Sequence, residues 1–196
     1  MSSQSPYPWQ SGYWSELTDS HKHEQLAHAY LIYGPKGIGK FDFIRKFSKY
    51  LLCHSPVNNL ACEKCDDCLL GVNSTHPDYI QISPENESRV IKIEQIRSLS
   101  SFLNKTSHSG RAKVAVLDGA HLLNTAAANA LLKTLEEPSK KTFIFLCSHL
   151  PGSLTLTVRS RCHKLAMKAP SRDMTIEWLK DNINSHSDFN SLAKAS

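Results

Sequence analysis

A glycine-rich segment, 34–40 (Gly-Pro-Lys-Gly-Ile-Gly-Lys), constrains the fold of this chain more than any other feature of its sequence. It follows the short apolar run 29–33, whose composition is that of a buried strand. Apolar residues then recur at helical spacing, which predicts a helix from Phe41 to about Cys53. A glycine-rich loop between a strand and a helix is typical of a phosphate-binding loop, because the glycines leave backbone N–H groups free to surround a phosphate.

This candidate loop lacks two groups that ATP hydrolysis needs. The motif normally ends in Ser or Thr, whose hydroxyl holds Mg²⁺, whereas Phe41 stands at this position. Asp118 ends the apolar run 113–118, but Gly119 follows it where hydrolysing enzymes carry a glutamate. We therefore expect no ATP hydrolysis, no productive binding of ATP and Mg²⁺, and weak nucleotide binding or none; an ordinary glycine-rich turn is the alternative. The candidate nucleotide-binding residues are Gly34, Gly37, Gly39, Lys40 and Asp118.

Strand-like and helix-like segments alternate along the rest of the chain. This order predicts an α/β fold with a parallel five-stranded sheet flanked by helices. Pro170 marks the expected boundary to a small helical part, and residues 54–78 show no regular pattern. The expected strands are 29–33, 78–82, 113–118, 142–147 and 162–167, and the further helices run from 93 to before 109, from 125 to 136 and from 172 to 183.

Four cysteines form a C-x8-C-x2-C-x2-C array within the irregular segment: Cys53, Cys62, Cys65 and Cys68. Four thiolates surround one zinc ion tetrahedrally and leave no open position for catalysis, so we favour a structural Zn²⁺ site. An iron–sulfur cluster, a different metal and plain thiols are the alternatives; the ferredoxin spacing, however, does not continue into 72–73. His76 is a further potential ligand, and Cys147 is expected to be a small buried side chain within a strand.

Composition narrows the class of protein without fixing its function. We find no signal peptide and no apolar stretch of the length that spans a membrane, which predicts a cytoplasmic protein with reduced thiols. The net charge of +5 permits contact with nucleic acid but does not indicate it, because a nucleic-acid site is recognised by clustered charge.

Further motifs carry a family resemblance that covers nearly the whole chain. The segments 129–138 (Asn-Ala-Leu-Leu-Lys-Thr-Leu-Glu-Glu-Pro) and 160–162 (Ser-Arg-Cys), together with the four-cysteine array, are specific in combination. The sequence resembles the bacterial DNA polymerase III clamp-loader subunits of the AAA+ class, and among them it is most similar to the δ′ type. The segments 7–9, 26–30, 34–40, 75–79 and 96–97 share the likeness.

The resemblance implies roles for particular residues. Phe41 and Gly119 match the degenerate δ′ type, and the four cysteines match a zinc module at 53–68. Arg161 is expected to act in trans as an arginine finger on ATP bound to a neighbouring subunit, since arginine stays charged and its planar fork can bind two phosphate oxygens. From the sequence alone, a surface salt bridge is the alternative for Arg161. Ser148 occupies the place of a sensor residue.

The family likeness also implies an organisation and a set of partners. We expect an AAA+ nucleotide-binding-like domain at 1–168 and the beginning of a helical lid domain at 169–196, without the C-terminal collar domain. The expected function is that of a non-hydrolysing clamp-loader subunit, without polymerase activity of its own, acting with γ/τ and δ subunits, the sliding clamp and primed DNA. Neither a membrane nor a small-molecule substrate is expected as a partner. An ATP-hydrolysing γ/τ-like subunit and a zinc-dependent DNA-binding module are the alternatives.

Overall fold

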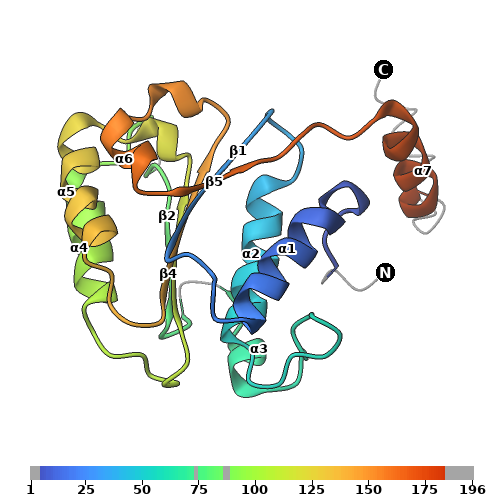
Figure 1. Cartoon of the computed structure of the whole chain (residues 1–196), viewed down its shortest axis with the longest axis horizontal. Helices are drawn as coiled ribbons and strands as arrows, with labels where there is room; N and C mark the ends of the chain where they lie inside the picture. The colour runs from blue at the N-terminus through green and yellow to red at the C-terminus, as the bar shows by residue number, and fades with distance from the viewer. Residues whose placement is uncertain (1–4, 73–74, 86–88, 184–196) are drawn as a thin grey trace.

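The computed structural model describes residues 5–72, 75–85 and 89–183, and its centre is a parallel sheet of five strands (Figure 1). The strands follow the spatial order β2-β3-β4-β1-β5. β1 lies between β4 and β5, so its carboxyl end is inside the sheet and not at its border, and the glycine-rich loop begins there. The bounds are β1 Ala29–Tyr33, β2 Tyr79–Ile82, β3 Lys113–Asp118, β4 Thr142–Ser148 and β5 His163–Ala166.

Helices cover both faces of the sheet, which explains why the three interior strands β1, β3 and β4 are nearly continuous buried runs. Tyr30 and Ile32 of β1 pack with α1 (Ser11–Lys22) and α2 (Lys40–Leu52). Leu31, between them, packs on the opposite face with α4 (Ile93–Leu103), α5 (Thr125–Glu136) and α6 (Leu156–Ser160). Figure 1 shows these two groups of helices on opposite sides of the strands. The predicted α/β fold with five parallel strands is therefore confirmed.

One buried carboxylate explains where two predicted elements begin and end. The strand expected from residue 78 begins one residue later, at Tyr79, and the helix expected to end before Ser109 ends at Leu103. The carboxylate of Asp78 accepts hydrogen bonds from the backbone N–H groups of His108 and Ser109, at 2.8 and 2.9 Å. Residues 104–112 form the turn that binds this carboxylate and therefore lie outside the helix.

Several short elements had no clear sequence signal. The segment expected to be irregular contains α3 (Asp66–Leu70), and α6 precedes β5. The sequence also gave no indication of α1, because only Trp14, Leu17 and Thr18 on this twelve-residue helix are buried. Three short 3₁₀ helices complete the described chain: η1 (Pro8–Gln10), η2 (Ala120–Leu122) and η3 (Pro151–Ser153).

The helix α7 (Arg172–Ile183) matches the expected range. It lies apart from the sheet and the two groups of helices that cover it, beside the N-terminal segment (Figure 1). Its Trp178 ring contacts Tyr7 and Trp9, with centroid distances of 5.4 and 5.7 Å. Residues 184–196 fall outside the described residues, so the division into 1–168 and 169–196 remains a prediction. Within the described part of the chain, no helix has both the length and the apolar character needed to span a bilayer.

Candidate functional site

The glycine-rich loop borders a cavity of about 560 Å³ at the carboxyl ends of the central strands. Open parallel sheets place ligand sites at this edge, where the loops that follow several strands meet. The loop between β1 and α2 forms one wall, and the segments after β3 and β4 form the other. Of the predicted nucleotide site, Gly37, Gly39, Lys40 and Asp118 line the cavity, together with Lys36, Phe41, Asp42, Pro84, Gly119, His121, Leu122, Cys147, Ser148 and His149.

Two glycines of the loop are required by close contacts. A Cβ atom at Gly34, where φ is +155°, would lie 2.1 Å from the carbonyl oxygen of Met167. At Gly39, where φ is +81°, a Cβ atom would lie 2.4 Å from the ring of Tyr7. The loop is thus held between the β5 end and the N-terminal segment, and neither position accommodates a side chain without displacement.

The ammonium group of Lys40 is turned back onto its own loop. Nζ donates hydrogen bonds to the carbonyl oxygens of Gly34 and Pro35, at 2.9 and 2.5 Å. Burial lowers the pKa of Lys40, and the charge of Asp118 opposes this effect. Lys40 therefore stabilises the conformation of the loop without a phosphate.

The predicted second half of the nucleotide site, after β3, has an altered chemistry. Asp118 pairs with Cys147 in the register of β3 and β4, so the thiol and the carboxylate lie on neighbouring strands at the edge of the cavity. Burial raises the pKa of both groups, that of Cys147 to about 12. Cys147 is buried within a strand as expected, but the sequence did not indicate its contact with Asp118.

Gly119 stands in a backbone conformation that suits glycine. Its φ is +77°, and an added Cβ would lie 3.2 Å from Cδ1 of Leu122. A glutamate here would therefore adopt a strained backbone. Next to it, the rings of His121 and His149 pack with centroids 4.0 Å apart, and both line the cavity. No sequence spacing indicated this pair, because the two residues follow different strands.

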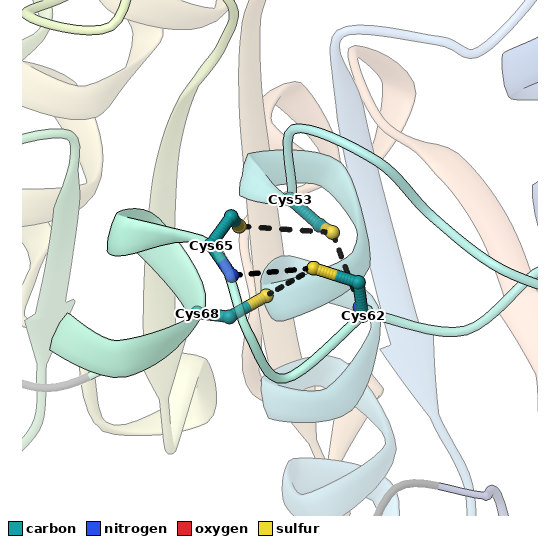
Figure 2. Close-up of side chains that lie close together, drawn as sticks. All are labelled: Cys53, Cys62, Cys65 and Cys68. Carbon is teal, nitrogen blue, oxygen red and sulfur yellow. Dashed lines mark hydrogen bonds between the residues drawn. The ribbon is translucent and has the colours of Figure 1, made fainter.

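The four predicted cysteine ligands come together in one cluster (Figure 2). Cys53 follows the last residue of α2, and Cys62 lies in the loop that returns from it. Cys65 caps α3 and Cys68 lies in the first turn of that helix, so a spacing of three places both on one side. His76 is not part of this group.

The sulfur positions fit a tetrahedral metal ion. All four Sγ atoms lie within 4.8 Å of one another, with 3.9 Å between Cys62 and Cys68 and 4.0 Å between Cys65 and Cys53. Zinc–sulfur bonds of about 2.3 Å place the sulfurs of a regular tetrahedron about 3.8 Å apart. A disulfide requires about 2.0 Å, so the observed distances favour a shared ion over two disulfide bonds.

Backbone N–H groups are directed at two of these sulfurs. The N–H of Cys62 donates to Sγ of Cys53 at 3.2 Å, and the N–H of Cys65 donates to Sγ of Cys62 at 3.4 Å. Hydrogen bonds from Lys64 and Cys65 lower the pKa of Cys62 to about 6, whereas burial raises the pKa of Cys53 and Cys68. A bound cation would favour the thiolate of all four cysteines.

Polar contacts attach the cysteine cluster to the rest of the fold. Trp14 of α1 donates from Nε1 to the carbonyl oxygen of Asn59 at 3.0 Å. Lys49 of α2 forms an ion pair with Glu63, which lies between Cys62 and Cys65 and adopts a positive φ of 59°. These contacts fix the loop that carries Cys62.

Arg161 lies at the end of α6 and does not line the cavity. Its Nη2 is 2.5 Å from Oε1 of Glu136, at the end of α5, and its Nη1 donates to the carbonyl oxygen of Thr157 at 3.1 Å. The side chain of Arg161 is 35% exposed and that of Glu136 47%. In the isolated chain, Arg161 therefore forms the surface salt bridge that was the alternative expectation.

Comparison with known proteins gives a family match over most of the chain. A sequence profile described as "DNA polymerase III, delta subunit" matches residues 9–171. The DNA polymerase III subunit delta′ of Pseudomonas aeruginosa is 43% identical over 173 residues, covering 88% of this chain and 52% of that protein. The delta′ subunit of Escherichia coli is 36% identical over 182 residues, covering 93% of this chain and 54% of that protein.

The similar structures have the same type of fold at low sequence identity. A DNA polymerase III gamma subunit-related protein from Thermotoga maritima superposes with a TM-score of 0.59 and 19% identity, covering 91% of this chain and 57% of its own. The RuvB Holliday junction branch migration motor of the same organism superposes with a TM-score of 0.54 and 15% sequence identity. The match covers 89% of this chain and 49% of that chain. These structures support the AAA+ type of fold. The chain spans about half the length of the curated relatives that it matches.

Proposed function

Because this chain belongs to the family of DNA polymerase III delta′ subunits, we propose that it is a non-hydrolysing subunit of a clamp loader. In this role it supports the ATP-driven loading of a sliding clamp onto primed DNA by neighbouring ATPase subunits. The observation that carries the proposal is the altered phosphate-binding site, in which the fold of an ATPase is retained without its catalytic groups.

Three features of that site argue against hydrolysis by this subunit. Phe41 offers no hydroxyl to Mg²⁺, and its side chain packs against the hydrophobic cluster under α2. Gly119 supplies no carboxylate to activate water, and its backbone conformation disfavours a replacement. Lys40 donates to carbonyl groups of its own loop, so phosphate binding must first break these hydrogen bonds. Residual nucleotide affinity is therefore weak.

We assign Arg161 a role in trans, on ATP held by an adjacent subunit. An exposed ion pair contributes only about 0–1 kcal/mol, so the Arg161–Glu136 pair can open at little cost when a phosphate offers a stronger partner. A guanidinium then stabilises the charge that develops on the transferred phosphoryl group. Glu136 holds the side chain at the surface until that partner is present.

The four cysteines, in this proposal, hold a structural zinc ion. Cys53, Cys62, Cys65 and Cys68 fill a tetrahedral shell, so the ion stabilises the loop 53–68 and takes no part in chemistry. The proposed partners are the γ/τ and δ subunits, and through them the clamp and primed DNA. The proposed location is the cytoplasm, and the proposed division of the chain is an AAA+ domain at 1–168 followed by the beginning of a lid at 169–196.

Reconstitution with the ATPase subunits of the same organism tests this function. Arginine fingers contribute roughly 10³–10⁵-fold in rate in GTPase systems, so Arg161→Ala should abolish most hydrolysis at the neighbouring site and clamp loading with it. Arg159→Ala removes a nearby arginine as a matched control, and Glu136→Gln frees Arg161 and should retain activity. Equal DNA- and clamp-stimulated rates for wild type and Arg161→Ala would refute the trans role. Turnover of Mg-ATP by the isolated chain would refute the non-hydrolysing assignment.

A further inference from the structure

A buried carboxylate lies between two of the cysteine positions. Asp67 is on α3, between Cys65 and Cys68, and its side chain is 9% exposed. Its Oδ2 is 3.1 Å from Nε2 of His54, and its Oδ1 is 3.4 Å from Nε2 of His76. Two imidazoles from outside the helix thus approach the two oxygens of one carboxylate.

Each of these histidines is connected to another part of the fold, His76 through its ring and His54 through its backbone carbonyl. His76 is 2% exposed, and its Nδ1 accepts the backbone N–H of Asp78 at 3.0 Å, so the neutral ring carries its proton on the nitrogen that approaches Asp67. The carboxylate of Asp78 is in turn held by the turn before β3. On the other side, the carbonyl oxygen of His54 accepts from Nη1 of Arg111 at 3.1 Å. Asp67 therefore connects α3 to β2 and to the loop before β3.

Apolar packing does little to hold α3 in place. Among the described residues, the buried cluster around the cysteine site consists of Cys53, Ala61 and Cys68, with Cys62 and Cys65 partly buried against it. Leu69, the next residue along α3, is 70% exposed. Because the hydrophobic contribution scales with the apolar area removed from water, so small a cluster cannot fix the helix by itself. The contacts of Asp67 with the two imidazoles are a second connection of this helix to the core, beside Val72, which follows the helix and packs into the large cluster under α2.

We propose that Asp67 and His76 are positioning residues for the metal site. They fix the orientation of α3 and thereby hold two of the four cysteines, Cys65 and Cys68, in the tetrahedral arrangement before the ion binds. This inference rests on the zinc binding that we propose as part of the function. Neither residue is a ligand; each acts through the helix that carries the ligands.

The test compares two neighbouring aspartates of the same helix in the full chain. Asp67→Asn removes the charge that the two imidazoles approach, and Asp66→Asn makes the identical change at an exposed position one residue earlier. Loss of partners that orient a metal site typically costs 10–100-fold in metal affinity. Competition with a chromophoric chelator should show this weakening of Zn²⁺ affinity for Asp67→Asn, and wild-type affinity for Asp66→Asn.

Changes at His76 separate positioning from a general effect on folding. His76→Gln keeps an N–H donor near Asp67 and should recover most of the affinity that His76→Ala loses. The visible spectrum of the Co²⁺-substituted chain should report altered tetrahedral thiolate bands for His76→Ala and wild-type bands for His76→Gln. Urea unfolding with and without Zn²⁺ should show that the loss of stability in Asp67→Asn is larger when the metal is present.

Two results would overturn the proposal. Equal Zn²⁺ affinities and equal Co²⁺ spectra for Asp67→Asn, Asp66→Asn and wild type would reduce Asp67 to an ordinary structural residue. A loss of stability of the same size with and without Zn²⁺ would lead to the same conclusion. If the wild-type chain itself binds neither Zn²⁺ nor Co²⁺, the proposed metal site fails as well, and the two failures are thereby distinguished.

Discussion

At the scale of single residues, the candidate phosphate-binding site retains residues that stabilise the folded chain through their own contacts. Lys40 satisfies two carbonyl groups of its loop, and Gly34 allows the close approach of Met167. Replacing either of them would destabilise the fold whether or not nucleotide binds. The hydroxyl that such loops normally carry after the lysine holds Mg²⁺, and the carboxylate normally found after the strand activates water; Phe41 and Gly119 supply neither group.

Asp78 is a buried charged residue, and we expect its replacement to lower the stability of the fold. Burial alone would raise the pKa of Asp78, but N–H and hydroxyl donors of Ser109, His108 and Ser107 outweigh burial and lower it below 3.8. In Asp78→Asn, an amide N–H₂ group replaces one of the accepting oxygens and leaves buried donors without a partner. We expect a loss of about 1–3 kcal/mol at pH 7, measured by urea unfolding.

The pH dependence of this loss checks its cause. Because the folded-state pKa lies below the unfolded value, the unfolded chain binds more protons between the two, and the carboxylate stabilises the fold above about pH 4. This contribution is lost as the pH falls through the folded-state pKa. The difference between wild type and Asp78→Asn should therefore shrink at pH 3, with a metal chelator present throughout. Asp19→Asn, at an exposed ion pair, is the control; a constant difference across this range would contradict the electrostatic explanation.

At the scale of elements, the sequence predicted those strands and helices whose signal lies in the spacing of neighbouring apolar residues. The three interior strands are short apolar runs covered on both faces, and the bounds of all five strands followed within about one residue. The helix α1 was not predicted because its few buried residues give little periodicity. The short helices α3 and α6 were missed because five residues cannot show a helical repeat.

Contacts between elements distant in the chain had no local signal. The array of four cysteines was readable because its members lie within sixteen residues. The Arg161–Glu136 pair joins two helices, and the thiol of Cys147 meets Asp118 only through the register of β3 and β4. The same holds for Asp67 and His76, since α3 itself was not expected. The clustering of the four cysteines could thus be predicted from the sequence, whereas the residues that surround the cluster required the fold.

The N-terminal segment that carries Tyr7 and Trp9 packs against the glycine-rich loop. Two glycines of this loop allow a matched test of that contact. Gly37 and Gly39 both have positive φ, of 86° and 81°, but only at Gly39 would a Cβ meet another group, the Tyr7 ring. Gly37→Ala should cost about 1 kcal/mol for backbone strain alone. Gly39→Ala should cost about 1–3 kcal/mol more, because Tyr7 and the stacked Trp9 must move.

Two measurements follow the displacement of this aromatic segment. Urea unfolding gives the difference in stability between Gly39→Ala and Gly37→Ala. Tryptophan fluorescence reports the surroundings of Trp9 and Trp178, which should change in Gly39→Ala and stay as in wild type in Gly37→Ala. Identical stabilities and spectra for the two variants would show that the aromatic segment does not hold the loop.

At the scale of the whole molecule, the residues that the structure describes form two large hydrophobic clusters and one small one. The two large clusters lie on opposite faces of the sheet and share its strands. The small cluster, around Cys53, Ala61 and Cys68, is separate from them. Regions with little buried apolar surface open at a lower free energy than the strands of a core. We therefore expect the segment that carries the four cysteines to open at a lower free energy than the strands of the sheet.

Removal of the proposed zinc ion should accordingly unfold the segment that carries the cysteines and leave the sheet folded. Zinc contributes on the order of 10 kcal/mol to the folding of small zinc domains, far more than three small buried side chains can supply. We expect chelation to abolish hydrogen-exchange protection in residues 53–70 and to leave β1, β3 and β4 protected, because their contacts lie in the two large clusters. Added Zn²⁺ should restore protection, and Cys68→Ser should show the open pattern even with Zn²⁺ present. Loss of protection in the strands at the same rate as in α3 would mean that the cysteine site and the sheet unfold as a single cooperative unit, with the contacts of Trp14 and Asp67 transmitting the change.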